Sequence, residues 1–168
     1  MSKKVVLAFS GGLDTSFCVP YLKEQGYEVH TVMVNTGGFS AEEEKAIEER
    51  AMKLGAASHK NVNAVNTYYE KGIRYLIYGN ILKNATYPLS VSSERVFQAL
   101  EVLKQVKAIG ADAVAHGSTG AGNDQVRFDI VFEILAPSVE IIAPVREHGF
   151  TRQYEIDFLQ QHGFDFTW

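Results

Sequence analysis

The feature that most constrains the fold is an apolar run near the N-terminus that ends in paired glycines. Residues 5–9 read Val-Val-Leu-Ala-Phe, and Ser10-Gly11-Gly12 follows, before a stretch typical of a helix. Such a run predicts a strand buried on both faces of a parallel sheet. The glycines let backbone amides converge on an anion, and the next helix adds its positive end. We therefore expect a phosphate site, although a turn without a ligand would give the same pattern.

The two commonest phosphate loops do not match this turn. A Walker A loop needs a lysine after its second glycine, and a dinucleotide fingerprint needs Gly-x-Gly-x-x-Gly; both are absent here. The segment Ser10-Gly11-Gly12-Leu13-Asp14-Thr15-Ser16 instead resembles the pyrophosphate loop of ATP-dependent adenylating enzymes, written SGGxDS. In that superfamily the loop grips the β,γ-pyrophosphate of ATP while the α-phosphate is attacked.

Strand and helix patterns alternate along the chain. Strands are predicted over residues 5–9, 29–34, 57–62, 113–115 and 140–143, and helices over 15–25, 41–54, 65–78, from Ser92 or Ser93 to 109, from about 123, and over 151–161. The alternation predicts an α/β fold, a doubly wound, Rossmann-like parallel sheet of five strands with helices on both faces. With 168 residues the chain fits a single domain, residues 1–168.

Several local signals refine these elements. Pro20 is expected to interrupt and kink the first helix. Ser40 and Glu43 form a capping box. Ser92 and Ser93 are expected to cap a later helix. Gly72 weakens the helix over 65–78, and Asn84-Ala85-Thr86, a glycosylation sequon by pattern, is interpreted as a loop.

Composition excludes some classes of protein. A net charge of -4 argues against nonspecific binding to nucleic acid, and no run of residues is apolar enough to span a membrane. The N-terminus has no signal-peptide pattern, so we expect a cytoplasmic protein. The single cysteine, Cys18, is either a nucleophile or, as is commoner, a buried free thiol.

A second glycine-rich segment runs from His116 to Asp129, again between a strand and a helix. Its helix is expected to be buried through Val126, Ile130, Val131, Ile134 and Leu135. Asn123 and Arg127 are four residues apart and share one helical face. The arginine needs an anionic partner, which can be a bound carboxylate or an internal one from Asp124, Asp129 or Glu133.

These two segments together resemble the argininosuccinate synthase family, which couples an SGGLDTS loop to a downstream HGxTGxGNDQVRF segment. The resemblance extends over nearly the whole chain and implies the family's N-terminal nucleotide-binding domain, with an adenine nucleotide alpha-hydrolase-like fold. It implies ATP with Mg as cofactors, and citrulline and aspartate as small-molecule substrates. It also implies a ligase of arginine biosynthesis and the urea cycle.

The resemblance assigns site residues position by position. Implied ATP-binding residues are Ala8, Phe9, Ser10, Gly11, Gly12, Leu13, Asp14, Thr15, Ser16, Val34 and Gly117. Implied aspartate-binding residues are Thr119, Asn123 and Asp124, and implied citrulline-binding residues are Tyr87, Ser92, Asn123 and Arg127. No catalytic side chain and no protein metal ligand is implied. The loop of residues 87–94 departs from the family's YPLGTSLARP pattern at Val91 and Glu94.

In the implied reaction, the citrulline ureido oxygen attacks the α-phosphate of MgATP, and the amine of aspartate then displaces AMP. Family members are homo-oligomers that continue into a second domain and an oligomerisation tail, neither of which this chain shows. We therefore expect ATP binding with little complete ligase activity. The alternatives are a stand-alone ATP- or AMP-binding module, and amide or thiol transfer to another acceptor, which the missing paired cysteines disfavour.

Overall fold

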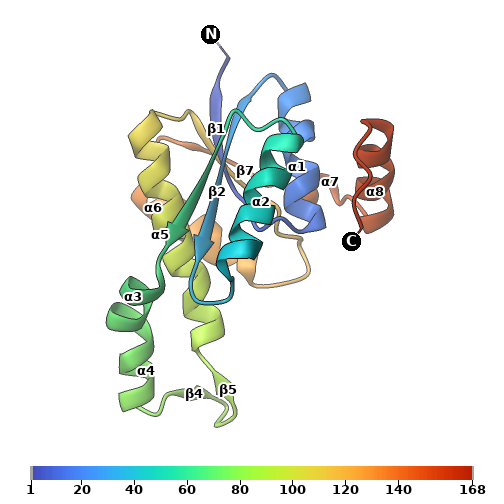
Figure 1. Cartoon of the computed structure of the whole chain (residues 1–168). Coiled ribbons are helices and arrows are strands. Elements are labelled where there is room, and N and C mark those ends of the chain that lie inside the picture. The colour runs from blue at the N-terminus through green and yellow to red at the C-terminus, as the bar shows by residue number, and fades with distance from the viewer. Residues whose placement is uncertain (1, 168) are drawn as a thin grey trace.

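A five-stranded parallel sheet forms the centre of the molecule in the computed structural model, which describes residues 2–167 apart from the side chain of Lys83 (Figure 1). Its strand order is β3-β2-β1-β6-β7. The strands are β1 (Lys4–Ala8), β2 (Glu28–Asn35), β3 (Ser58–Asn63), β6 (Ala113–His116) and β7 (Glu140–Ile142). All four pairings are parallel, which confirms the predicted fold class.

Strand β1 lies at the middle of the sheet and is buried on both faces. Val5 and Leu7 pack into one core and Val6 into the other, because successive side chains of a strand point to opposite faces. The first core is covered by α1 (Leu13–Glu24), α2 (Ala41–Lys53), α7 (Pro144–His148) and α8 (Arg152–Gln161). The second is covered by α5 (Ser90–Ile109) and α6 (Asp124–Leu135).

The direction of winding reverses between β1 and β6. From β1 the chain moves outward to β2 and β3, whereas β6 and β7 add to the other side of β1. The loops after β1 and β6 therefore leave the same edge of the sheet next to each other, since Ala8 pairs with His116. Ligands bind at such a reversal point in open parallel sheets.

The helix boundaries bear out some of the local predictions. Ser40 and Glu43 form the predicted capping box: Ser40 N–H donates to Glu43 Oε2 at 2.8 Å, and Glu43 N–H donates to Ser40 Oγ at 3.3 Å. Helix α1 continues without a break through Pro20, so the predicted interruption is wrong. Pro20 is buried against the core, and packing there offsets the backbone hydrogen bond that proline cannot donate.

The predicted cap of α5 is also wrong. The helix begins at Ser90, and its N-cap, Leu89, has no side-chain cap. Ser92 and Ser93 lie within the first turn and make tertiary contacts. Ser93 Oγ lies 3.1 Å from the hydroxyl of Tyr68, and Ser92 Oγ accepts a hydrogen bond from Arg127.

Helix α6 is less buried than its composition indicates. Its sheet-facing side consists of Phe128, Val131 and Phe132. The other apolar residues expected in the core are instead exposed: Val126, Ile130, Ile134 and Leu135. The physical reason is spacing, since positions 126, 130 and 134 follow one another at four-residue intervals on the side of the helix away from the sheet.

Residues 65–88 extend beyond the carboxyl edge of the sheet (Figure 1). They comprise α3 (Val65–Tyr68), the π-helical segment η1 (Tyr69–Ile73), α4 (Arg74–Tyr78) and an antiparallel ribbon of β4 (Leu82–Lys83) and β5 (Tyr87–Pro88). Gly72 permits close packing, because a Cβ there would lie 3.0 Å from the Phe97 ring. The predicted loop at Asn84 is the turn of this ribbon. Over the described residues, we find no helix with the length and apolarity needed to cross a membrane.

Candidate functional site

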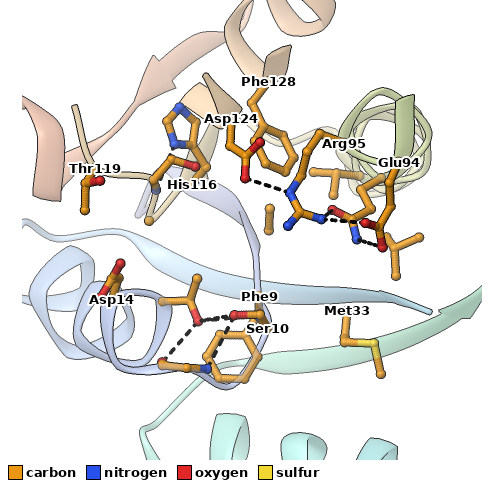
Figure 2. A pocket seen from close by; sticks show the side chains of 18 of the residues that line it. Phe9, Ser10, Asp14, Met33, Glu94, Arg95, His116, Thr119, Asp124 and Phe128 are labelled. Carbon is orange, nitrogen blue, oxygen red and sulfur yellow. Dashed lines mark hydrogen bonds and ion pairs between the residues drawn. The ribbon is translucent and has the colours of Figure 1, made fainter. Parts of the chain in front are cut away.

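A cavity of about 750 Å³ opens at the carboxyl edge of the sheet, where the loops after β1, β2 and β6 meet. Twelve of the seventeen predicted site residues line it: Ala8, Phe9, Ser10, Gly12, Leu13, Asp14, Thr15, Val34, Gly117, Thr119, Asn123 and Asp124. Figure 2 shows Ser10 and Asp14 on one wall, and Thr119 and Asp124 on the wall opposite. The topology thus brings together two motifs about a hundred residues apart in sequence.

The first loop is held in a compact turn at the start of α1. Gly11 has a φ of 76°, a left-handed conformation that favours glycine. Ser10 Oγ lies 3.2 Å from Thr15 Oγ1, and Arg50 donates a 2.5 Å hydrogen bond to the Gly11 carbonyl. The first backbone hydrogen bond of the helix is donated by Ser16 N–H to the Gly12 carbonyl. The amides of residues 13–15 therefore make no backbone hydrogen bond within the helix. Those amides, at the positive end of α1, suit an anion.

Gly117 is the point at which the two loops touch. A Cβ at this position would lie 3.0 Å from the Thr15 amide nitrogen and 3.1 Å from the Asp14 carbonyl carbon. Both neighbours are backbone atoms, which cannot swing aside as a flexible side chain can. The predicted site therefore depends on a residue without a side chain where β6 ends.

His116, the last residue of β6, anchors the start of the second loop. It is 1% exposed and stacks on Phe128, with ring centroids 5.5 Å apart. The backbone amide of Ser118 donates to Nδ1 at 3.2 Å, so the proton of the neutral ring is on Nε2, which donates to Asp129 at 3.0 Å. Burial lowers the pKa of His116, which keeps the ring neutral at pH 7. Arg146 forms an ion pair with Asp129 and completes this network.

Arg127 finds an internal partner, one of the two possibilities left by the sequence. Its guanidinium donates to Asp124 Oδ1 at 2.6 Å and to Ser92 Oγ at 3.1 Å. Arg95 binds the other oxygen of the same carboxylate, with Nε donating to Oδ2 at 3.1 Å. Asp124 thus links α5 to α6 at the rim of the cavity.

Glu94 lies at the same rim. It accepts a 2.5 Å hydrogen bond from Thr36 Oγ1 and pairs with Arg95 at 3.2 Å. Glu94 stands where the family pattern has alanine, and its contact with Thr36 joins the start of α5 to the loop after β2. Glu94 therefore adds a carboxylate to the rim of the cavity near β2.

Apolar side chains also line part of the cavity. Val32, Met33, Val34, Phe39 and Val102 line the end near β2, whereas hydroxyl and backbone groups of the first loop line the end near α1. One end therefore suits a flat apolar group and the other suits an anion. Figure 2 shows Met33 at the far side of the cavity from Asp14.

Helix α8 contributes two charged residues next to the first loop. Arg152 lines the cavity, and Glu155 is 2% exposed beneath it. Burial, with a further contribution from Asp14, raises the pKa of Glu155 to about 8. Cys18 is buried as well, and burial raises the pKa of its thiol well above the usual value. The thiol is therefore protonated at neutral pH, which does not favour a nucleophilic role.

Five predicted site residues do not line the cavity: Gly11, Ser16, Tyr87, Ser92 and Arg127. Gly11 lies within the turn of the first loop, and Tyr87 lies on the ribbon. Arg127 is bonded to Asp124 and Ser92. Ser16 is fully buried, and its hydroxyl has no hydrogen-bond partner among the described residues. Tyr87 is 45% exposed on β5.

Sequence reasoning missed several residues that line the cavity, among them Arg95, Gln98, Phe128 and Arg152. Arg95 and Gln98 continue one face of α5 beyond Ser92, so helical spacing could have indicated them. Arg152 had no such signal, because it meets the first loop only through the packing of α8 against α1.

Comparison with known proteins agrees with this geometry. A family model described as the arginosuccinate synthase N-terminal HUP domain matches residues 4–165. The argininosuccinate synthase of Xanthomonas campestris pv. campestris is 47% identical over 167 residues, which cover 97% of this chain and 42% of that protein. The enzyme of Pyrobaculum aerophilum is 45% identical over 163 residues, covering 96% of this chain and 41% of that protein. The chain thus spans about two fifths of the length of these curated relatives.

Solved structures show the same fold at low sequence identity. A 4-thiouridine synthetase in complex with RNA and bound ATP has a TM-score of 0.72 and 18% identity, covering 96% of this chain and 41% of that one. A predicted subunit of a tRNA methyltransferase from Methanocaldococcus jannaschii has a TM-score of 0.59 and 20% identity, covering 97% and 89%. The extent of the family match, together with the two motifs that meet at one cavity, shows that this chain belongs to the argininosuccinate synthase family.

Proposed function

We propose that the cavity binds MgATP, with the phosphates at the first loop and the base at the apolar end. The observation that carries this proposal is the division of one cavity into two chemically distinct ends. Amides at the N-terminus of α1 suit phosphate oxygens. The walls formed by Met33, Val34 and Phe39 suit the faces of an adenine ring. The ATP bound to the fold relative with a TM-score of 0.72 gives further support.

We further propose that the nucleotide is used for argininosuccinate synthesis. In this reaction the ureido oxygen of citrulline attacks the α-phosphate and releases pyrophosphate, and the aspartate amine then displaces AMP. The protein's part is to position three substrates and to neutralise charge, which requires no side-chain nucleophile. Thr119, Asn123 and Asp124 are the proposed aspartate contacts, because they line the wall opposite the phosphate loop.

The citrulline contacts we propose are Ser92, Asn123, Arg127 and Tyr87. Ser92 and Arg127 are already joined by a 3.1 Å hydrogen bond at the rim. The Arg127 guanidinium can exchange its internal partner for the carboxylate of a bound amino acid, since both are bidentate acceptors. Tyr87 lies on the β4–β5 ribbon, so the ribbon would have to move toward the cavity for Tyr87 to contact citrulline.

Magnesium would accompany the nucleotide. No group of three or more His, Cys, Asp or Glu side chains that could hold a metal ion occurs within residues 2–167 as described. We propose that phosphate oxygens carry most of the cation's coordination, because Mg²⁺ is commonly bound by substrate phosphates and one or two carboxylates.

A substrate scan tests the proposal. The protein is incubated with MgATP alone, then with citrulline, then with citrulline and aspartate, while pyrophosphate, AMP and argininosuccinate are measured. Pyrophosphate release that depends on citrulline supports the ligase, and citrulline labelled with ¹⁸O in the ureido group should transfer the label to AMP. Nucleotide binding with no response to either amino acid supports a binding module instead. Failure to bind MgATP contradicts both.

A further inference from the structure

Glu155 is the buried charged group that the proposed reaction leaves unused. The residue is 2% exposed, and its Oε2 atom has no hydrogen-bond partner among the described residues. A carboxylate buried without a donor is costly, so such a group needs either a donor or a proton of its own.

The packing of α8 on α1 places this carboxyl against the phosphate loop. The Phe17 ring lies 6.0 Å from the Tyr154 ring and 5.0 Å from the Phe158 ring, centroid to centroid. Glu155 lies between the two α8 rings in sequence, and Asp14 lies one turn before Phe17 on α1. The Asp14 carboxyl group is near enough to add to the raised pKa of Glu155, after burial, through its charge and through side-chain hydrogen bonding.

The other groups that face Glu155 do not supply a second donor. Cys18, one turn after Asp14, is buried and protonated, and Arg152 lies on α8 itself, where it favours the charged form only weakly against burial. Two facing carboxyl groups can bond only when a proton lies between them, because both are acceptors when ionised. Burial is the main cause of the raised pKa of Glu155, and the neighbouring Asp14 adds to it.

We propose that Glu155 is a positioning residue for the phosphate loop: it holds Asp14 through one shared proton, so that the pair presents a single negative charge to the bound phosphates. This inference rests on the proposed nucleotide site. Asp14 lines the cavity and Glu155 lies behind it. Without the shared proton, two negative charges would lie beside a polyanion.

The first test needs no nucleotide. Infrared spectroscopy of the ligand-free chain should show a protonated carboxyl band at pH 7 that disappears as the pH rises past about 8. The band should be absent from Glu155→Gln and present in Asp157→Asn, a matched control on the exposed side of the same helix, where Asp157 accepts a 2.7 Å hydrogen bond from Gln153. A wild-type chain with no protonated carboxyl at pH 7 would overturn the proposal, whatever the variants do.

The second test measures the effect on binding. Calorimetry with MgATP, and separately with inorganic pyrophosphate, is run from pH 6.5 to 9.5 on the wild type and both variants. Between pH 7 and pH 9 the wild type and Asp157→Asn should lose on the order of tenfold more affinity than Glu155→Gln, because only they gain the second charge. The amide of glutamine can still donate to Asp14 without titrating.

Each outcome has a distinct meaning. If Glu155→Gln follows the wild-type pH profile, the proposal is overturned even if both proteins bind MgATP. If the wild type binds neither MgATP nor pyrophosphate, the proposed function fails, and the infrared band still decides whether the carboxyl groups share a proton.

Discussion

Gly117 is the residue on which the contact between the two loops depends. A methyl group there would meet the backbone of residues 14 and 15 at 3.0 to 3.1 Å. We predict that Gly117→Ala weakens MgATP binding at least about tenfold, which corresponds to about 1.4 kcal/mol, because the phosphate loop must shift. Calorimetry measures the effect.

Gly120 supplies the matched control within the same motif. The nearest atom to a Cβ at Gly120 would be Arg146 Cγ at 3.9 Å, an ordinary contact. Gly120→Ala should therefore bind MgATP within about twofold of the wild type. Equal loss of MgATP affinity in both variants would contradict this account. It would mean that binding depends on the backbone flexibility of glycine and not on the close approach of the two loops at Gly117.

Glu155 also links the stability of the fold to pH. Its pKa is about 8 in the folded chain, against 4.5 for an ordinary glutamate, so the folded state binds more protons than the unfolded state between these values. Stability therefore falls as the pH rises from about 4.5 to about 8, and stays low above it. We predict that Glu155→Gln raises the free energy of unfolding on the order of 2 kcal/mol at pH 8.5 and changes it little at pH 5.

Urea denaturation at the two pH values checks this prediction. Asp157→Asn is again the control, because it removes a carboxylate from the same helix on its exposed side. The account is contradicted if Glu155→Gln gains the same stability at pH 5 as at pH 8.5, since a simple packing effect would not depend on protonation.

At the scale of elements, α6 offers a direct test of which helical face is buried. Val131 is 8% exposed and Val126 is 48% exposed on the same helix. We predict that Val131→Ala lowers the free energy of unfolding by about 1–3 kcal/mol, because it leaves space in the second core. Val126→Ala should change it by less than about 0.5 kcal/mol.

The pair is well matched, because both changes alter helix propensity equally and differ mainly in burial. Urea unfolding of the two variants measures the difference. Equal destabilisation would show that α6 is buried on both sides, as its composition alone indicates.

Strands and helix ends could be predicted from the sequence where a single strong local pattern determines them. Strands β1, β2, β6 and β7 follow from apolar residues, β3 (SHKNVN) from its place in the alternation of strands and helices, and the capping box from Ser40 and Glu43. The start of α5 was mispredicted because Ser92 and Ser93 serve tertiary contacts, to Arg127 and Tyr68, which compete with capping. The exposed face of α6 was mispredicted because periodicity cannot say how much of an apolar helix the sheet covers.

At the scale of the whole molecule, much of the candidate site could be predicted, because parallel strands can be connected in only a few ways. The parallel pairing of β1 and β6 places the loops after them side by side, so two glycine-rich segments far apart in sequence form one site. The wall supplied by α8 was not predictable. Glu155 approaches Asp14 through packing between elements 141 positions apart, and no local pattern encodes that distance.

The central claim is that the two loops form one nucleotide site, and calorimetric titration of the 168-residue chain with MgATP tests it most directly. We predict saturable binding at one site per chain, competition by inorganic pyrophosphate, and a clear loss of affinity in Gly117→Ala but not in Gly120→Ala. Absence of saturable binding, or binding that pyrophosphate does not reduce and Gly117→Ala does not weaken, would contradict the claim.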